Sequence, residues 1–392
     1  MKILIVSSYF PPHVGGVEVV AEQQARSLAE AGHTVVVATS RTEQVSAGRA
    51  GGADYDVVRL PANNLLERHT GVPYPIIGPA FCRGLAALIR WCDVVHVHDV
   101  LYLPSQVAAL IARFAGRPIY VTQHVGRLYH SSRVVLAVAA LMAAVAGRCL
   151  WHRARRVIAH NVLVADYLQA RGVPSAQVVC TPNGIDTTAF APGPVGDAHA
   201  QRERLGLPGD RPLVLFVGRL VPRKGYELLV EAADAGYHVV LAGSGRPACS
   251  LPAGVTWVGP VPRADLVTLY RLADVFVLPS DAEIFPLAVQ EAMACGLPIV
   301  TTDDPGYHRY GIDRELFFLV EPSPVELRQA IRTILSDHPL SRRMSEHSRW
   351  FAVEHFDWRV NQKALAGLYD QGLPTYDDPH REEQTWTSAS SS

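Results

Sequence analysis

The sequence predicts an α/β protein with two domains, each built on an open parallel sheet. Short apolar runs alternate with helical patterns along the chain, as in strands joined by crossover helices. A stretch rich in Pro, Gly and Asp, PNGIDTTAFAPGPVGDAH (182–199), interrupts this alternation near the middle. The length of 392 residues allows two domains, each with its own core. We therefore predict a first domain over 1–185 and a second over 186–356.

The apolar runs give the predicted strands in order. In the first half they are ILIVSS, TVVVAT, DVVRL, VVHVH, PIYVTQ, RVIAH and VVCTP. In the second half they are LVLFVG, HVVLAG, VTWVG, VFVLPS, PIVTT and FFLVEP. Open α/β sheets bind ligands outside the carboxyl ends of their strands, so two such sheets facing each other would form a cleft. The polar tail at 372–392 is predicted to be disordered.

Composition favours an ordinary globular protein of the cytoplasm. Apolar residues make up 48% of the chain and charged residues 19%, which is typical of that class. The apolar run that follows Lys2 is too short for a secretory signal. The six cysteines show no C-x-x-C spacing, and several lie in apolar runs. We therefore expect buried free thiols in a reducing compartment.

Two stretches of the second half combine anion-binding and hydroxyl-binding side chains. In SDAEIFPLAVQEAMACG (280–296), Glu283 lies in a loop after a strand, and Glu291 lies in a helix predicted from Pro286 to Cys295. In FVGRLVPRKG (216–225), Arg219 and Lys224 stand between a strand and a helix. Two cations beside a helix N-terminus suit phosphate, and carboxylates without a metal suit sugar hydroxyls. The pattern predicts a pocket for a nucleotide sugar.

These stretches and several others resemble the retaining glycosyltransferases of family 4, which have the GT-B fold. The resemblance covers nearly the whole chain and rests on the order of its patches, among them MKILIVSSYFPPHVGGVE, DVVHVHD, VTQHVG, PNGIDTTAF, VVLAGSGR and VTWVGPVPRADL. It implies two Rossmann-like domains facing each other across a cleft. It also implies that the last helix, about 357–371, crosses back to complete the first domain.

The resemblance assigns roles to residues of the second domain. Arg219 and Lys224 would neutralise the diphosphate leaving group, where other glycosyltransferases use a metal. Glu283 would contact the hydroxyls of the donor sugar, and Glu291 would accept hydrogen bonds from the ribose. Four further residues of the donor site are implied, and they are Val261, Phe285, Pro286 and Leu287. The amides of Phe285 and Leu287 would face the phosphate, whereas Pro286 has no N–H to offer.

In the first domain the resemblance points to Gly15, Gly16 and His124. The two glycines would let the backbone approach a phosphate or the reacting sugar, although an ordinary tight βα turn explains them too. His124 would lie near the anomeric carbon and the sugar 6-hydroxyl, or it would have a structural role only. His96 and His98 lie on one face of a strand, but we interpret them as the family's strand pattern and predict no metal site.

The implied chemistry is a metal-independent, retaining hexosyl transfer with no cofactor besides the UDP- or GDP-sugar co-substrate. Retaining glycosidases use a carboxylate nucleophile about 5 Å from the acid, and the sequence offers no obvious candidate for one. The family mechanism is front-face displacement, in which the departing phosphate takes the proton of the acceptor hydroxyl. The protein then contributes positioning and electrostatic stabilisation.

Charge patterning bears on the acceptor. Residues 1–190 hold 17 Lys and Arg against 11 Asp and Glu, and the remainder holds 19 against 26, so positive charge is concentrated in the first domain. Residues 100–165 contain no acid and eight arginines, namely Arg113, Arg117, Arg127, Arg133, Arg148, Arg153, Arg155 and Arg156. The apolar run at 134–147 is too short to span a bilayer. It is either a core helix or an interfacial helix with a basic end carrying Trp151.

The interfacial interpretation predicts a protein peripheral to the inner membrane face, binding anionic lipid. Its acceptor would be a lipid-linked sugar or glycan precursor of a cell-envelope polysaccharide, and no nucleic acid would be bound. A soluble small-molecule acceptor remains the alternative, as do a GT-B sugar phosphorylase, an epimerase and a catalytically silent binding protein. The presence of all four charged residues Arg219, Lys224, Glu283 and Glu291 argues against a silent protein.

Overall fold

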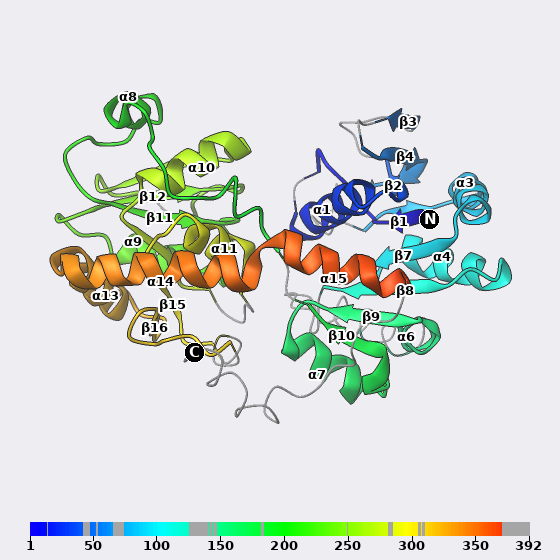
Figure 1. Cartoon of the computed structure of the whole chain (residues 1–392). Helices are drawn as coiled ribbons and strands as arrows, with labels where there is room; N and C mark the ends of the chain where they lie inside the picture. Colours follow the sequence, from blue (N-terminus) through cyan, green and yellow to red (C-terminus); the bar gives the residue numbers. More distant parts are fainter. Residues whose placement is uncertain are drawn as a thin grey trace. The chain divides into compact units, whose positions relative to one another are not determined.

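The chain forms two compact units, each an open sheet flanked by helices (Figure 1). The first unit contains Met1–Asn183 together with the residues from Arg359 onward, and the second contains Gly184–Trp358. The structure is a computed structural model. It describes residues 1–370 except positions 14, 42–47, 52–53, 66–73, 125–139, 141–143, 145–146, 182–183, 249, 281–284, 305–306 and 308–309.

The sheet of the first unit has the strand order β10-β9-β8-β7-β1-β2-β4-β3. Its strands are β1 (Lys2–Val6), β2 (Thr34–Ser40), β3 (Gly48–Gly51), β4 (Asp56–Leu60), β7 (Val94–His98), β8 (Ile119–Gln123), β9 (Arg156–Ala159) and β10 (Val178–Cys180). All pairs are parallel except β3 with β4. A separate two-stranded ladder pairs β5 (Ala62–Asn63) with β6 (Ile76–Ile77). Nearly every residue of the central strands is buried, as expected for a parallel sheet covered on both faces.

Helices cover both faces of this sheet (Figure 1). The helices are α1 (Gly16–Glu30), α3 (Pro79–Trp91), α4 (Leu103–Phe114), α6 (Arg148–Arg153), α7 (Val162–Ala170), the 3₁₀ turn η2 (Ser175–Gln177) and α15 (Trp358–Asp370). The core on one face takes side chains from α3, α4, α6 and α7. The core on the other face takes side chains from α1 and α15, among them Leu28, Leu365 and Leu368. The C-terminal helix thus packs on the sheet formed by the N-terminal half of the chain.

The sheet of the second unit has the order β13-β12-β11-β14-β15-β16, and every pair is parallel. Its strands are β11 (Leu213–Val217), β12 (His238–Ala242), β13 (Val255–Gly259), β14 (Val275–Leu278), β15 (Ile299–Thr302) and β16 (Phe318–Val320). Its helical elements are α8 (Ala198–Arg204), the 3₁₀ turn η3 (Pro222–Lys224), α9 (Tyr226–Glu231), α10 (Arg263–Leu272), α11 (Leu287–Ala294), α13 (Pro324–Ser336) and α14 (His338–Phe356). Ser323 begins α13 as its N-cap, since its hydroxyl accepts a hydrogen bond from the amide of Glu326.

Every strand predicted from an apolar run is present, and all of these strands pair in parallel as predicted, with β3 adding one antiparallel edge strand to the first sheet. The sequence did not predict β3, β5 and β6, which carry no continuous apolar run because they pair at an edge or outside the main sheet. The helix predicted over 286–295 is confirmed as α11 with Pro286 and Cys295 as its caps. The predicted tail lies outside the described residues.

The structure favours one of the two alternatives left open for Trp151 and corrects one expectation about the cysteines. Trp151 is fully buried, and its indole N–H donates to the Oε1 of Gln123, so it belongs to the core and not to an interfacial helix end. Of the 134–147 run, the described Ala140 and Ala144 are exposed. Cys92 and Cys295 are buried free thiols as expected, but Cys149 is exposed because it lies on the outer face of α6.

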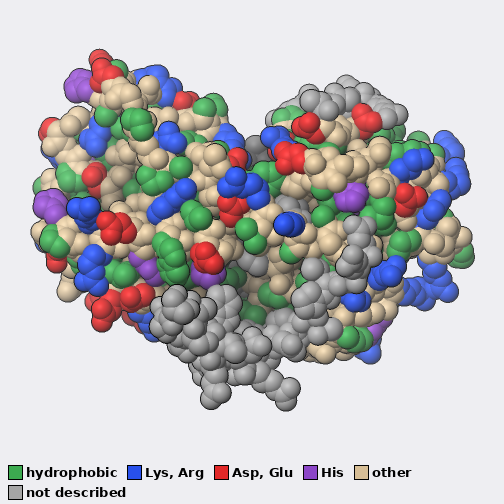
Figure 2. Space-filling model, viewed as in Figure 1, with side chains coloured by type: hydrophobic (Ala, Val, Ile, Leu, Met, Phe, Trp, Pro, Cys, Tyr) green, Lys and Arg blue, Asp and Glu red, His purple; other side chains and the backbone are tan. Residues whose placement is uncertain are grey.

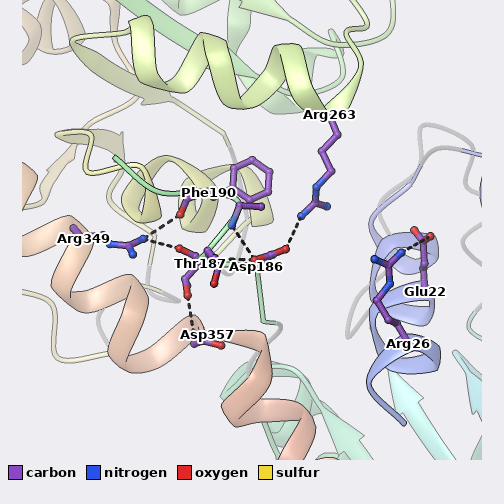
Figure 3. Close-up of polar contacts among 10 residues, drawn as sticks. Glu22, Arg26, Asp186, Thr187, Phe190, Arg263, Arg349 and Asp357 are labelled. Carbon is purple, nitrogen blue, oxygen red and sulfur yellow. Dashed lines mark hydrogen bonds and ion pairs between the residues drawn. The ribbon is translucent and has the colours of Figure 1, made fainter. Parts of the chain in front are cut away.

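The segment that opens the second unit is held down by α14 and α10 (Figure 3). Nη1 of Arg349 lies 2.8–3.0 Å from the carbonyl oxygens of Thr187, Phe190 and Ala294, which share its two N–H groups. The hydroxyl of Thr187 donates to the carboxylate of Asp357 at 2.6 Å. One guanidinium therefore satisfies three carbonyl groups from two segments that are distant in sequence.

Replacing Arg349 with Ala should destabilise the second unit by about 2–4 kcal/mol, because it leaves three carbonyl groups without their charged donor. The matched control is Arg342→Ala on the same helix. Arg342 is 82% exposed and, within the part of the chain that the structure describes, pairs with Glu346 alone, so its loss should change stability by no more than about 0.5 kcal/mol. Thermal unfolding followed by calorimetry measures both variants. Equal stabilities of the two variants would contradict the role assigned to Arg349.

Candidate functional site

In both sheets the strand order reverses beside the first strand of the unit. In the first unit the reversal lies between β1 and β7, and in the second it lies between β11 and β14. Ligands of open α/β sheets bind outside the carboxyl ends of strands at such points. Among the described residues, Asp99 and Phe285 are the non-glycine residues with positive φ, at 59° and 51°. Each follows the strand at a reversal point, where backbone strain often accompanies function.

The two cations of the second unit lie at its reversal point. Arg219 follows β11 and is exposed, and Lys224 ends η3 and is partly buried. Gly225 comes next with φ 69°, and a Cβ there would stand 1.9 Å from the carbonyl oxygen of Pro279 just past β14. Only a glycine allows this approach. The close contact therefore brings the Lys224 turn against the loop that leads to α11.

A second close contact lies on the other side of β11. Gly243 follows β12 with φ 138°, and a Cβ there would stand 2.0 Å from the carbonyl oxygen of Gly218. The amide of Gly218 donates in turn to the carbonyl of Ala242 at 3.0 Å. The backbone of Gly243 therefore packs directly against that of Gly218 at the carboxyl ends of β11 and β12, where both residues are partly buried. Gly218, Gly225 and Gly243 lie in VGRLVPRKG and VVLAGSGR, where the sequence pattern alone did not indicate their role.

The N-terminus of α11 is the third part of the candidate site in the second unit. Phe285 is buried, and its ring packs among Tyr307, Phe351 and Phe356. The side-chain amide of Gln290 donates to the carbonyl of Phe285 at 2.9 Å, which fixes the strained turn from inside. Pro286 and Leu287 are partly exposed. The first amides of a helix have no intrahelical acceptor, so those of Leu287 and Ala288 are the N–H groups that an anion at this helix end would use.

Glu291 lies one turn further along α11, partly buried. The hydroxyl of Tyr270 donates to its Oε2 at 3.0 Å. Burial raises the pKa of Glu291 to about 7, against the opposing effects of the Tyr270 hydrogen bond and the charge of Arg263. Val261 stands two residues before Arg263, between β13 and α10, and is partly exposed. Glu291 thus titrates near neutral pH.

In the first unit, Gly15 is the N-cap of α1 in extended backbone conformation. A Cβ at Gly15 would stand 2.2 Å from the carboxylate of Glu18, whereas Gly16 has open space around it. The carboxylate of Glu18 is held by Nδ1 of His13 at 2.8 Å. Packing against Glu18 therefore accounts for Gly15, and the sequence analysis missed His13 and Glu18.

Four histidines stand side by side at or near the carboxyl ends of β7, β8 and β9. His96 and His98 lie on β7, His124 follows β8, and His160 follows β9. Burial lowers the pKa of all four, and the neighbouring imidazoles lower those of His96, His98 and His124 further. The rings are therefore neutral at pH 7. No three His, Cys, Asp or Glu side chains of the described part of the chain converge as a metal site.

The structure brings the predicted residues together in two groups. Lys224 and Arg219 lie beside the loop that leads to Leu287 and Glu291 in the second unit. Gly15 and His124 lie at the carboxyl edge of the sheet in the first unit. Glu283 lies outside the described residues. Among the described helices, none is long and apolar enough to cross a bilayer.

Two family models match the chain in turn. The model described as "Glycosyltransferase Family 4" matches residues 14–189, and "Glycosyl transferases group 1" matches residues 197–350. A D-inositol 3-phosphate glycosyltransferase 1 of Catenulispora acidiphila is 31% identical over 82% of this chain and 83% of that protein. A GDP-mannose-dependent α-(1-6)-phosphatidylinositol monomannoside mannosyltransferase of Mycolicibacterium smegmatis is 29% identical over 93% of this chain and 97% of that protein.

The solved structures agree on the fold. The Anabaena protein HepE in complex with UDP-glucose superposes with a TM-score of 0.72 at 20% identity, covering 94% of this chain and 99% of that one. Two Rossmann-like α/β units are the architecture of the GT-B glycosyltransferases, which this chain shares. The chain belongs to glycosyltransferase family 4. Its activity is the transfer of a sugar from a nucleotide sugar.

Glu291 gives a prediction on donor affinity. If its charged carboxylate accepts hydrogen bonds from the ribose, affinity should rise about tenfold between pH 6 and pH 8, because deprotonation through a pKa of about 7 converts the neutral acid, a weaker acceptor, into the charged one. Calorimetry with an intact nucleotide sugar measures this cleanly, since its diphosphate diester does not titrate in that range. Glu291→Gln should bind about 5- to 150-fold more weakly and lose the pH dependence. A pH-independent wild-type affinity would remove Glu291 from the ribose site.

Proposed function

We propose that this enzyme transfers a hexose with retention of anomeric configuration, from a UDP- or GDP-hexose to an acceptor hydroxyl, without a metal ion. The observation that carries the proposal is the grouping at the reversal point of the second unit. Lys224 and Arg219 lie there beside the loop that leads to the N-terminus of α11. Together they offer fixed positive charge and N–H groups to a diphosphate.

In the proposed reaction the diphosphate is both the leaving group and the base. The C1–O bond to the diphosphate breaks, and the acceptor oxygen forms its bond to C1 on the same face. The acceptor proton passes to the departing phosphate oxygen, so no protein nucleophile is needed. Lys224 and Arg219 stabilise the charge that develops on the diphosphate. Glu283 contacts the sugar hydroxyls, and Glu291 binds the ribose.

For the acceptor we propose a lipid-linked sugar at a membrane surface. One relative is named for action on a phosphatidylinositol monomannoside, which is a lipid acceptor. Another is named for D-inositol 3-phosphate, so a soluble acceptor is the second candidate. A sugar phosphorylase or an epimerase is a further alternative, and dependence of turnover on free phosphate would identify the former.

The surface of the first unit supports the lipid-linked choice. On α4, Phe114 is 82% exposed and Leu110 is 54% exposed. Arg113 beside them is exposed, as are Arg153 and Arg155 at the end of α6. Figure 2 shows Lys and Arg side chains along the edge of this unit where α3, α4 and α6 lie in Figure 1. Apolar side chains surrounded by cations suit the interface of an anionic bilayer.

The first test concerns the leaving group. Activity on UDP- or GDP-hexoses should persist in EDTA, and the product should keep the anomeric configuration of the donor by NMR. Lys224→Ala should lower kcat about 10²–10³-fold, since it removes one positive charge that stabilises the leaving group. Arg223→Ala is the control, because Arg223 is an exposed cation of the same turn and should leave kcat within about threefold. Full dependence on added Mg²⁺ or Mn²⁺ would contradict the metal-free mechanism.

The second test concerns the membrane. The purified protein should sediment with vesicles containing anionic lipid and not with neutral ones, and binding should weaken as salt rises. Replacing Leu110 and Phe114 with Ser, or Arg113, Arg153 and Arg155 with Gln, should release it, since each cation contributes about 1 kcal/mol. Trp350→Ser is the control, because Trp350 is exposed on α14 of the other unit. Binding indifferent to lipid charge would favour a soluble acceptor.

A further inference from the structure

The four histidines of the first unit form one continuous column. The ring centroids of His96 and His98 lie 5.2 Å apart, those of His98 and His124 5.2 Å apart, and those of His124 and His160 4.8 Å apart. Each of the three neighbouring strands contributes to it at or near its carboxyl end. The resemblance to the family assigns a role to His124 alone and gives no reason for the other three.

One hydrogen bond in the column joins two imidazoles directly. Nδ1 of His98 lies 2.9 Å from Nε2 of His124. Both rings are neutral because burial and their neighbours lower both pKa values. A neutral imidazole carries one N–H, so one of the two nitrogens donates and the other accepts. The direction of this bond therefore fixes the tautomer of both rings.

The other nitrogen of His98 decides the direction. Nε2 of His98 is fully buried without a hydrogen-bond partner among the described residues. If His124 donated, Nε2 of His98 would carry a buried N–H with no acceptor, which is a rare and costly state. If His98 donates, its Nε2 is only an unpaired acceptor. His160 has this second pattern: its Nδ1 must donate to the carbonyl of Thr181 at 3.1 Å, and its buried Nε2 is unpaired.

We propose that His98 is a positioning residue, whose Nδ1–H donates to Nε2 of His124 and thereby makes the Nδ1 of His124 a hydrogen-bond donor. That Nδ1–H then donates to an oxygen of the bound sugar. No hydrogen bond to the Nδ1 of His124 is present among the described residues. The proposal rests on the proposed function for its ligand, but not for the tautomer itself.

His96 shows that the column contains two different kinds of histidine. Its Nδ1 lies 2.6 Å from the hydroxyl of Tyr369, and its Nε2 lies 2.7 Å from the hydroxyl of Thr122. The side-chain amide of Gln24 also lies 3.0 Å from its Nδ1. Both nitrogens of His96 therefore have partners on α1, α15 and β8. Its bonds hold helices on the sheet, whereas the single inter-ring bond of His98 acts on His124.

Nitrogen-15 NMR of histidine-labelled protein tests the tautomer without any substrate. The signal of His124 is assigned as the one that disappears in His124→Asn. In the wild-type protein this signal should show the ring proton on Nδ1. In His98→Leu the ring proton of His124 should move wholly or partly to Nε2. In His98→Asn it should stay, because the side-chain amide of Asn takes the place of the Nδ1–H donor. The matched control His96→Asn, on the same strand and equally buried, should lower thermal stability and leave the tautomer of His124 unchanged. A wild-type His124 protonated on Nε2 would overturn the proposal.

Steady-state kinetics test the consequence. His98→Leu should lower kcat about 5- to 150-fold with little change in the KM for the donor, since the bond lost at the sugar contributes 1–3 kcal/mol. His98→Asn should restore kcat to within about threefold. Equal losses in both variants would reduce His98 to a packing residue. If the tautomers behave as expected but no nucleotide sugar is turned over, the proposed function fails. The role of His98 in fixing the tautomer of His124 then still stands.

Discussion

The alignment of parallel strands is the constraint on which the rest of this structure depends. In a parallel sheet all chains leave at the same edge, and at a reversal of strand order neighbouring chains leave in opposite directions. The backbone at this edge of the sheet needs conformations that ordinary residues avoid, which Gly225 at the reversal and Gly243 beside it supply by lacking a Cβ. Phe285 adopts positive φ without being glycine, and its ring is held in an aromatic cluster. The core thus stabilises a strained turn at the edge where the ligand is expected to bind.

Burial sets the protonation states at this edge, with opposite results in the two units. In the second unit it raises the pKa of Glu291 to about 7, so a carboxyl group titrates under physiological conditions. In the first unit it lowers the pKa values of four histidines, so these rings stay neutral well below pH 7. Desolvation disfavours the charged form in both cases. A neutral histidine column offers directed hydrogen bonds, whereas an exposed Arg219 offers charge.

Sequence patterns predicted the regular parts of the fold because each depends on neighbours in the chain. Continuous apolar runs such as VVHVH identify strands buried on both faces, and Pro286 with Gly296 marks the limits of α11. The same patterns failed where exposure depends on packing. The basic stretch around Trp151 is amphipathic in sequence, but the indole fits the core and donates to Gln123. Cys149 was expected to be buried, but it lies on the exposed outer face of the same short helix.

The sequence by itself determined the strand order along the chain, the placement of Lys224, Arg219 and Glu291 next to strand ends, and the family. Those features follow from local spacing. Only the tertiary structure decided that Gly225 meets Pro279, that Arg349 gathers three carbonyl groups, and that His98 meets His124. These pairs are separated by 26 to 162 residues, and their contacts depend on which strands lie side by side. Strand adjacency follows from packing of the whole sheet, which no local pattern encodes.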